Sequence, residues 1–167
     1  SNVYCIIFYM DKFSIIIPVH NEAKNLKILI PKIYQELKNR KFEIIIVDDN
    51  SNDMTSKILK KFKKSNFHHF IRKGERDLSK SCILGFKRSK YKNIIVMDGD
   101  LQHKPSDIKK ILYANHKINP DIIVGTRDLF KNKKHNLNIF RLFASRILIF
   151  AGVTLSSAII AVSTAFA

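Results

Sequence analysis

Runs of apolar residues, each about as long as a β-strand, recur along the chain and set the strongest limit on its fold. Within each run the apolar residues are mostly continuous rather than alternating with polar ones, which is typical of strands buried on both faces of a parallel sheet. The runs are Phe13 to Ile17, Phe42 to Val47, Phe67 to Ile71, Asn93 to Met97 and Asp121 to Val124.

Between these runs, apolar residues recur every three or four positions, which is the spacing of an amphipathic helix. Strand and helix therefore alternate, and we expect an α/β fold with a mostly parallel sheet flanked by helices. The residues with helical spacing are Leu26, Leu29, Ile30, Ile33 and Leu37, and then Met54, Ile58 and Phe62.

Residues that favour helix starts lie near these segments. Asn21 is a candidate N-cap of the first helix, with the acidic Glu22 beside the positive end of the helix dipole. Ser51 or Asn52 is placed to cap the second helix, and Pro105 suits the first turn of a later one. We therefore expect helices to start shortly after the apolar runs.

The charge of the chain is strongly basic. Its 167 residues suffice for one domain with a core, and they include 30 Lys and Arg against 14 Asp and Glu. The net charge of +16 indicates phosphate, nucleic acid or an acidic membrane surface as partner, although lysines on an ordinary solvated surface give the same total. The basic run at 60–64 lies within a helical pattern and the strand ends are acidic, so we expect no nucleic-acid partner.

The two ends of the chain differ from its middle. Residues 1–10 are apolar but lack the basic start and cleavage pattern of a signal peptide, so we expect residues 1–12 to be an N-terminal extension. Residues 131–138 have the composition of a basic surface loop. Residues 147–167 carry no charge, which suits a membrane-spanning helix, an interfacial hairpin or a core helix without its partners.

Cys5 and Cys82 lie in apolar stretches and are expected to be structural thiols in a reducing compartment.

Polar residues follow four of the apolar runs, at 18–22, 48–53, 98–103 and 125–127. Ligands of open α/β sheets bind outside the carboxyl ends of the strands. Because these ends meet at one edge of a parallel sheet, we expect a single crevice lined by residues from all four segments.

Asp98 and Asp100 flank Gly99, which permits close approach of a ligand. The two carboxylates offer hard oxygen ligands to a divalent cation, and Gln102 offers a third oxygen. Mg²⁺ and Mn²⁺ commonly bind through one or two carboxylates and a substrate phosphate. An Asp-x-Asp triplet also occurs on solvated turns, but its place between the apolar residues 94–97 and Leu-Gln-His at 101–103 favours a metal site.

Two other groups of polar residues are candidates for ligand contact. Asp48 and Asp49 end a buried run, where a carboxylate can accept hydrogen bonds from a base or a ribose hydroxyl; helix capping explains only part of the acidic cluster at 49–53. Arg127 presents a fork of donors that matches phosphate geometry, and Arg141 lies fourteen residues further along. Each arginine taken alone would more often be a surface residue.

Several short motifs occur in a fixed order. They read Pro-Val-His-Asn-Glu at 18–22, Val-Asp-Asp-Asn-Ser-Asn-Asp-Met-Thr at 47–55, Asp-Gly-Asp-Leu-Gln-His at 98–103, Gly-Thr-Arg at 125–127 and Ser-Arg at 145–146. Together they resemble the motifs of family-two glycosyltransferases of the polyprenyl-phosphate (dolichol-phosphate) mannose synthase type. The Leu-Gln-His extension favours this type over processive polysaccharide synthases.

The resemblance implies a Rossmann-like nucleotide-diphosphosugar transferase fold, with a catalytic domain over residues 13–146. The Asp-Pro-x-Ser-Gly-Phe type segment with which the family continues is not found, so we expect this domain to be incomplete and residues 147–167 to be an apolar, membrane-associated tail. His20 stands where the family more commonly has Tyr. The implied contacts are Pro18, His20, Glu22, Val47, Asp48 and Asp49 at the nucleoside, Asp98, Gly99 and Asp100 at the diphosphate, Asp98, Asp100 and Gln102 at the metal, and Arg127 and Arg141 at the donor and acceptor phosphates.

The resemblance also implies a reaction and its partners. The expected reaction is the inverting transfer of mannose from GDP-mannose to a polyprenyl or dolichyl phosphate, with Mg²⁺ or Mn²⁺. We expect it at the cytoplasmic face of an anionic membrane surface. Family members that use a UDP-sugar or another acceptor share the donor motifs, and an inactive truncated remnant is a further alternative.

Overall fold

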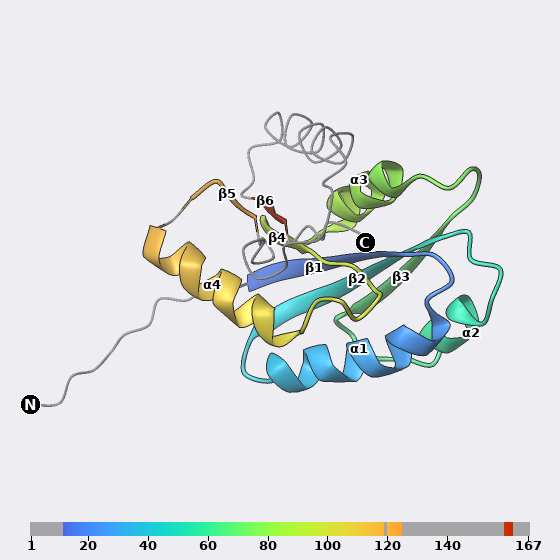
Figure 1. The fold of residues 1–167 in the computed structure, drawn as a ribbon, viewed down its shortest axis with the longest axis horizontal. Helices are drawn as coiled ribbons and strands as arrows, with labels where there is room; N and C mark the ends of the chain where they lie inside the picture. The colour runs from blue at the N-terminus through green and yellow to red at the C-terminus, as the bar shows by residue number, and fades with distance from the viewer. Residues whose placement is uncertain (1–11, 119, 125–158, 162–167) are drawn as a thin grey trace, which may run out of the picture.

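The computed structural model describes residues 12–118, 120–124 and 159–161. They form a six-stranded sheet in the order β3-β2-β1-β4-β6-β5, in which every pair of neighbouring strands is parallel (Figure 1). The predicted α/β fold is therefore confirmed. The strands are β1 (Lys12–Val19), β2 (Lys41–Asp49), β3 (Phe67–Arg72), β4 (Asn93–Val96), β5 (Ile122–Val124) and β6 (Ile159–Ala161), and the helices are α1 (Ala23–Glu36), α2 (Thr55–Leu59), α3 (Leu78–Arg88) and α4 (Ser106–Ile118).

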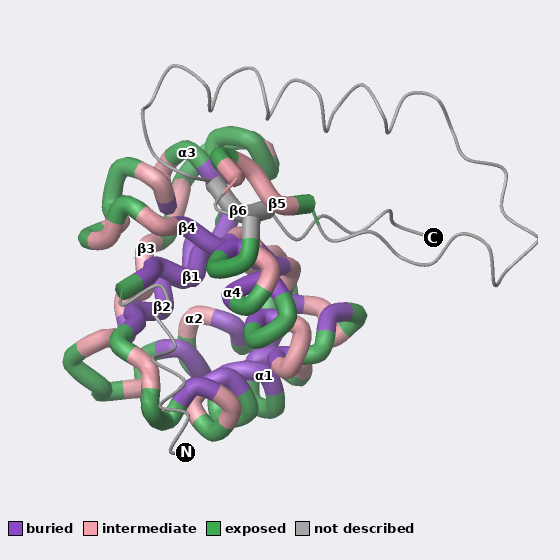
Figure 2. Tube along the Cα trace, turned by 90° about the vertical axis from the view of Figure 1, so that its left-hand side faces the viewer, coloured by how far each residue is buried: buried purple, intermediate pink, exposed green. Residues whose placement is uncertain are grey.

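The central strands are continuous apolar runs because helices cover both faces of the sheet. In β1 every residue from Phe13 to Val19 is buried, and β2 is buried from Phe42 to Asp49 (Figure 2). Helices α1, α2 and α4 lie on one face and α3 on the other (Figure 1). Burial on both faces removes the alternation of polar and apolar residues that marks a half-exposed strand.

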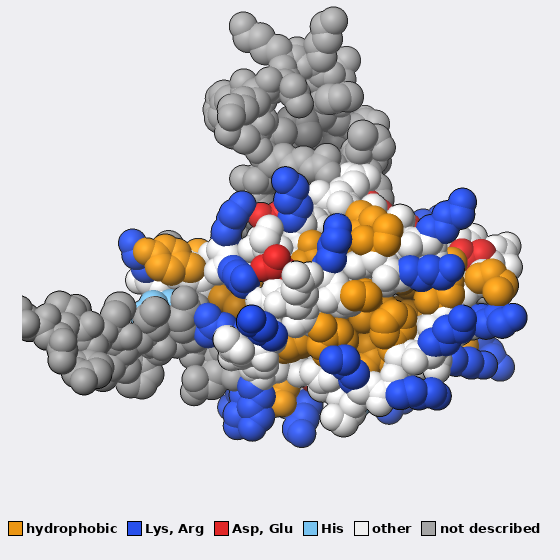
Figure 3. Space-filling model, turned by 90° about the horizontal axis from the view of Figure 1, so that it is seen from below, with side chains coloured by type: hydrophobic (Ala, Val, Ile, Leu, Met, Phe, Trp, Pro, Cys, Tyr) orange, Lys and Arg blue, Asp and Glu red, His pale blue; other side chains and the backbone are white. Residues whose placement is uncertain are grey.

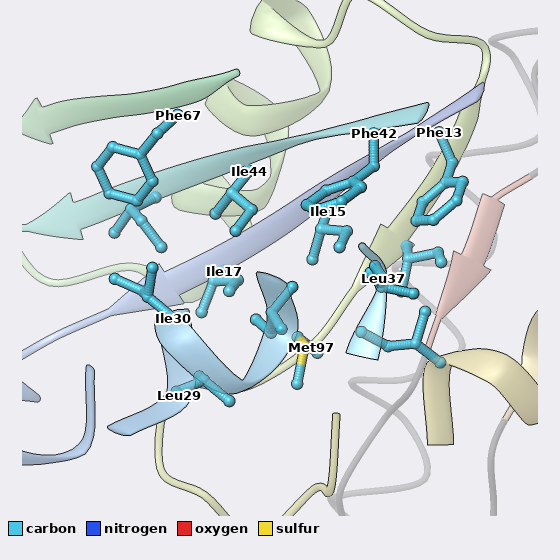
Figure 4. Close-up of a cluster of buried hydrophobic side chains, with 14 of the residues drawn as sticks. Phe13, Ile15, Ile17, Leu29, Ile30, Leu37, Phe42, Ile44, Phe67 and Met97 are labelled. Atoms are coloured by element: carbon cyan, nitrogen blue, oxygen red, sulfur yellow. The ribbon is translucent and has the colours of Figure 1, made fainter. Parts of the chain in front are cut away.

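Side chains of each strand alternate between two hydrophobic clusters. On the α1 side, Ile15 and Ile17 of β1 and Ile44 of β2 pack against residues of α1 such as Ile30 (Figure 4). On the α3 side the cluster is built around Ile16, Ile45, Val47 and Ile94, with Phe70, Leu84, Phe86 and Val96 packed against it. Odd-numbered residues of β1 and even-numbered residues of β2 therefore face α1, whereas the others face α3.

The predicted caps of the first two helices are wrong. Helix α1 begins after Glu22 and α2 after Met54, and neither of these N-cap residues makes a side-chain cap hydrogen bond. Asn21 instead has a positive φ of 58° and accepts a hydrogen bond from the Asn52 backbone N–H. Asn21, Ser51 and Asn52 thus bind one another, and it is Asp53 that accepts hydrogen bonds from the first backbone N–H of α1 and of α2.

A strand occupies part of the apolar segment at 147–167. Residues Ile159–Ala161 form β6, which lies between β4 and β5, rather than the helix or hairpin considered from composition. The remainder of that segment, the extension at 1–11 and the basic loop at 131–138 lie outside the described residues. Among the helices that the structure describes, none is long and apolar enough to cross a membrane.

Candidate functional site

A pocket opens at the carboxyl ends of β1, β2 and β4, next to the first turn of α3. Three of the four predicted strand ends meet there, while the fourth, residues 125–127, lies outside the described residues. The pocket is on the α3 side of the sheet, which is the side that Asp49 faces at the end of β2. Its lining residues are Pro18, Val19, His20, Glu22, Asp49, Arg76, Leu78, Ser81, Asp98, Gly99 and Asp100.

The turn after β4 brings two carboxylates into the pocket. A Cβ on Gly99 would lie 2.9 Å from Val19 Cγ1, so a side chain there would force the turn away from β1. Asp100 Oδ1 accepts a hydrogen bond of 2.9 Å from the backbone N–H of Gln102. Leu101 between them has a positive φ of 65°, an uncommon conformation for a residue with a branched side chain, and its side chain packs against the core. These contacts hold Asp98 and Asp100 at the pocket, whereas Gln102 is not among the lining residues.

Asp48 and Asp49 are neighbours in sequence but serve different parts of the structure. Asp48 is fully buried on the α1 side, where its carboxylate accepts hydrogen bonds from Ser51 N–H (2.9 Å) and Ser56 Oγ (2.6 Å). Burial alone would raise the pKa of Asp48, but these bonds and the nearby His69 hold that pKa well below its ordinary value. Asp48 therefore stays ionised and shapes the loop that leads to α2, away from the pocket.

Asp49 lines the pocket and anchors the segment that follows β3. Its carboxylate forms an ion pair with Arg72 and accepts a hydrogen bond of 2.7 Å from the Asp77 backbone N–H. Its carbonyl oxygen lies 2.9 Å from His20 Nδ1, and because a carbonyl only accepts, Nδ1 carries the hydrogen. His20 Nε2 then accepts from Asn21 Nδ2 at 3.3 Å. The imidazole at the pocket wall is thus fixed from both sides.

The loops after β1 and β2 are tied together by hydrogen bonds between their polar residues. Asn21 N–H donates to Ser51 Oγ (2.9 Å), and Ala23 N–H donates to Asp53 Oδ2 (3.3 Å). Asp53 Oδ1 also accepts from Thr55 N–H at 2.8 Å, at the start of α2. Several motif residues therefore do not line the pocket but hold the two loops that form its wall.

Val47 is placed by the structure in the hydrophobic cluster beneath α3, fully buried, and its side chain does not line the pocket. Arg127 and Arg141 lie outside the described residues. Of the predicted contacts, the structure thus brings together Pro18, His20, Glu22, Asp49, Asp98, Gly99 and Asp100.

A family model described as glycosyl transferase family 2 matches residues 14–154, which is most of the chain. The chain belongs to glycosyl transferase family 2. The dolichol-phosphate mannosyltransferase of Pyrococcus furiosus is 36% identical over 142 residues, which cover 84% of this chain and 40% of that protein. The family predicted from the motifs is therefore confirmed.

Two solved structures show the same fold as this family 2 chain. The mannosyltransferase PcManGT from Pyrobaculum calidifontis, in complex with GDP-Man and Mn²⁺, has a TM-score of 0.59 at 17% identity and covers 71% of this chain and 37% of its own. TarS 1–349 of S. aureus in complex with UDP has a TM-score of 0.57 at 22% identity, covering 76% and 38%. The nucleotide-sugar transferase fold is confirmed. The chain spans only 40 to 58% of the length of the curated relatives it matches.

Besides Val19, which lies within the predicted segment at 18–22, three lining residues of this family 2 domain were missed in the sequence: Arg76, Leu78 and Ser81. All three come from the end of the connection after β3 or from the start of α3. A signal for them exists, because the strand-end rule that found the other residues applies equally to the apolar run at Phe67 to Ile71. Cys82 lies one residue further on, and its burial, helped by the nearby carboxylates of Asp98 and Asp77, raises the pKa of its thiol to about 12. This agrees with the expected structural role of Cys82.

Proposed function

We propose that the chain carries the donor-binding part of a glycosyltransferase that moves a hexose from a nucleotide diphosphate to a polyprenyl phosphate. The observation that carries this proposal is the pocket, in which the ends of β1, β2 and β4 bring the separate motif residues together. The name of the P. furiosus relative supports a polyprenyl phosphate as acceptor. A family member with another acceptor would have the same donor pocket.

The donor we propose is GDP-mannose, with a UDP-sugar as the second candidate. The structural relatives with GDP-Man and with UDP support one candidate each. Pro18, His20, Glu22 and Asp49 would surround the nucleoside, with Asp98, Gly99 and Asp100 at the diphosphate. Burial leaves Val47 and Asp48 no side-chain contact with the pocket, so we assign them to its support.

The carboxylate oxygens at the pocket are suitable ligands for a Mg²⁺ or Mn²⁺ ion. Asp98 and Asp100 supply two carboxylates at the pocket, and within the described part of the chain no group of three acidic, His or Cys side chains could hold an ion alone. Both ions commonly take one or two protein carboxylates and complete their shell with water and substrate phosphate. When bound, the ion would neutralise charge that develops on the leaving diphosphate.

The proposed reaction has little need of a general base. A lipid phosphate has its second pKa near ~6 and is largely ionised at neutral pH, so its oxygen can attack the anomeric carbon directly. The new carbon–oxygen bond forms as the bond to the diphosphate breaks, and the nucleoside diphosphate leaves with the electron pair. One displacement inverts the anomeric carbon. We propose that Arg127 and Arg141 hold the two phosphates in line, and that the reaction takes place at the cytoplasmic face of a membrane.

Calorimetry of the chain with GDP and with UDP, each with Mn²⁺, tests this proposal. We expect GDP to bind more tightly than UDP. Asp98→Ala and Asp100→Ala should remove the dependence of binding on Mn²⁺ while changing the free energy of unfolding by less than about 1 kcal/mol, because both residues lie on a turn at the surface of the pocket.

Each outcome of this experiment has a distinct meaning. Failure of the wild-type chain to bind either nucleotide at millimolar concentration would reject the donor site. Binding that is equal with Mn²⁺ and with excess chelator would reject the metal site alone. Trapping of a covalent glycosyl-enzyme in a longer, active form of the protein would contradict single displacement.

A further inference from the structure

The charge of the pocket does not suit an anionic donor unless a cation takes part. Four carboxylates line it, from Glu22, Asp49, Asp98 and Asp100, whereas Arg76 is the single Lys or Arg among the lining residues that the structure describes. Asp49 is already paired with Arg72. A nucleoside diphosphate entering this pocket therefore meets Arg76 as the one cationic side chain among the described lining residues.

The backbone on both sides of Arg76 is anchored to the end of β2. On one side, the Glu75 carbonyl accepts a hydrogen bond from the Arg72 guanidinium. On the other side, the Asp77 N–H donates to Asp49 Oδ2 at 2.7 Å, and Arg72 pairs with the same carboxylate. These contacts fix the backbone position from which the Arg76 side chain extends. A fixed backbone lowers the entropic cost of binding a ligand there.

The Arg76 side chain itself is exposed at the pocket and makes no hydrogen bond or ion pair with another residue that the structure describes. Its guanidinium is always charged and presents parallel N–H donors, which match two oxygens of a phosphate. An unengaged guanidinium on an anchored segment, at a pocket lined with carboxylates, is suited to an anionic ligand rather than to stabilising the fold.

We propose that Arg76 binds the diphosphate of the nucleotide donor. This inference rests on the proposed function, since it assumes that a nucleoside diphosphate occupies the pocket. Arg76 would hold the diphosphate from the α3 side, while Asp98 and Asp100 reach it from the turn after β4 through the cation. This contact would add the connection between β3 and α3 to the segments that bind the nucleotide donor.

The test compares binding of GDP, UDP and guanosine to the wild-type chain and to Arg76→Gln, Arg76→Lys and Lys73→Gln, with Mn²⁺ present. Lys73 is the matched control, because it lies in the same connection, is exposed and loses the same charge, but does not line the pocket. Thermal unfolding of each variant shows whether the fold is kept.

We expect Arg76→Gln to weaken GDP binding about ten- to a hundredfold, which is the usual effect of losing a charge-assisted hydrogen-bond pair. Arg76→Lys should recover part of the loss, and Lys73→Gln should bind like wild type. Guanosine should bind equally to all of them, because it has no phosphate.

Equal GDP affinity of Arg76→Gln and wild type would overturn the inference and leave the proposed function intact. An equal loss for guanosine and GDP would also overturn it, by placing Arg76 at the base. If wild type binds neither GDP nor UDP, the proposed function fails and this inference fails with it.

Discussion

Two adjacent aspartates at the end of β2 show how one residue step changes the role of a side chain. Asp48 faces α1 and is sealed under the loop to α2, whereas Asp49 faces α3 and lines the pocket. Successive strand residues point to opposite faces, so the two carboxylates cannot share one ligand site. The first is a structural anion away from the pocket, and the second lies at the pocket wall, where it also anchors Arg72 and the Asp77 backbone.

Asp48→Asn tests the structural role. The hydrogen bonds that keep the pKa of Asp48 low stabilise the folded state above the ordinary carboxyl pKa of about 4, and this contribution is lost as pH falls through the lowered pKa. We expect the substitution to reduce the free energy of unfolding by about 2 kcal/mol at pH 7, because the buried amide replaces only part of these bonds. Urea unfolding should show this difference shrinking below pH 4, and a difference independent of pH would contradict the assignment.

At the scale of elements, the contact between α3 and β1 fixes one wall of the pocket. Gly85 lies where α3 crosses β1, and a Cβ added there would overlap Ile16 Cγ2. The close approach keeps the start of α3, with Leu78 and Ser81, beside the end of β1. The glycine thus serves helix-to-sheet packing rather than a turn.

Gly85→Ala separates packing from helix propensity. Alanine is better than glycine in a helix by about 1 kcal/mol, so an open site would become more stable. We expect the opposite sign, a loss of about 1 to 3 kcal/mol, because the core is overpacked at Ile16. Chemical unfolding measures the change, and Ile16→Ala in the same chain should make Gly85→Ala less harmful. Ser79→Ala, at an exposed position of α3, is the control and should cost little.

Several elements could be predicted from the sequence, and the reason others could not is physical. Continuous apolar runs marked the strands, and the strand-end rule found Asp49, Asp98 and Asp100 at the pocket. Because residues on both faces of these strands are apolar, the sequence does not show which residues face α1 and which face α3. The sequence therefore did not separate Asp48 from Asp49, nor show that Val47 points into the core.

The misassigned residues near the loops and at the C-terminal end have a different cause. Asn21 and Ser51 are residue types that cap helices, but their side chains bind backbone N–H groups about 30 residues away, and these partners exist only when β1 and β2 are paired. A segment as apolar as 147–167 fits a helix and a buried strand equally well. The pairing of residues 159–161 as β6 depends on β4 and β5, which lie far from them in the sequence.

For the molecule as a whole, the basic charge is the property that still lacks a partner. Figure 3 shows Lys and Arg side chains spread over the face that carries α1, around hydrophobic side chains and with few acidic ones. Each Lys near an anionic leaflet contributes about 1 kcal/mol of attraction. We therefore expect the lysines of this face to attract the chain to an acidic membrane, where a lipid acceptor would be found.

Vesicle flotation tests this expectation. We expect binding to vesicles that contain anionic lipid, weakening as salt rises, and little binding to neutral vesicles. Replacing Lys60, Lys61 and Lys63 by Gln removes charge from the segment that follows α2, on the face that carries α1, and should reduce binding. Replacing Lys131, Lys133 and Lys134 by Gln removes equal charge from the basic stretch at 131–138 and should also reduce it. Deleting 147–167 is a poor test because it removes β6. Recovery of the intact chain in the unbound fraction at low salt would reject membrane association.

The place of β6 bears on the order in which the molecule can fold during synthesis. Its residues 159–161 pair with β4 and β5, so β5 has no strand partner in the described sheet until they leave the ribosome. Strands β1 to β4 pair only with one another among the residues that precede β6, so they can assemble first. Their pairing closes shorter loops and therefore has a lower entropic cost. The side of the sheet that holds β1, β2 and the pocket can thus form before the other side is closed. A nascent chain halted before residue 159 would expose the free edge of β4, which is the point most open to pairing with another chain.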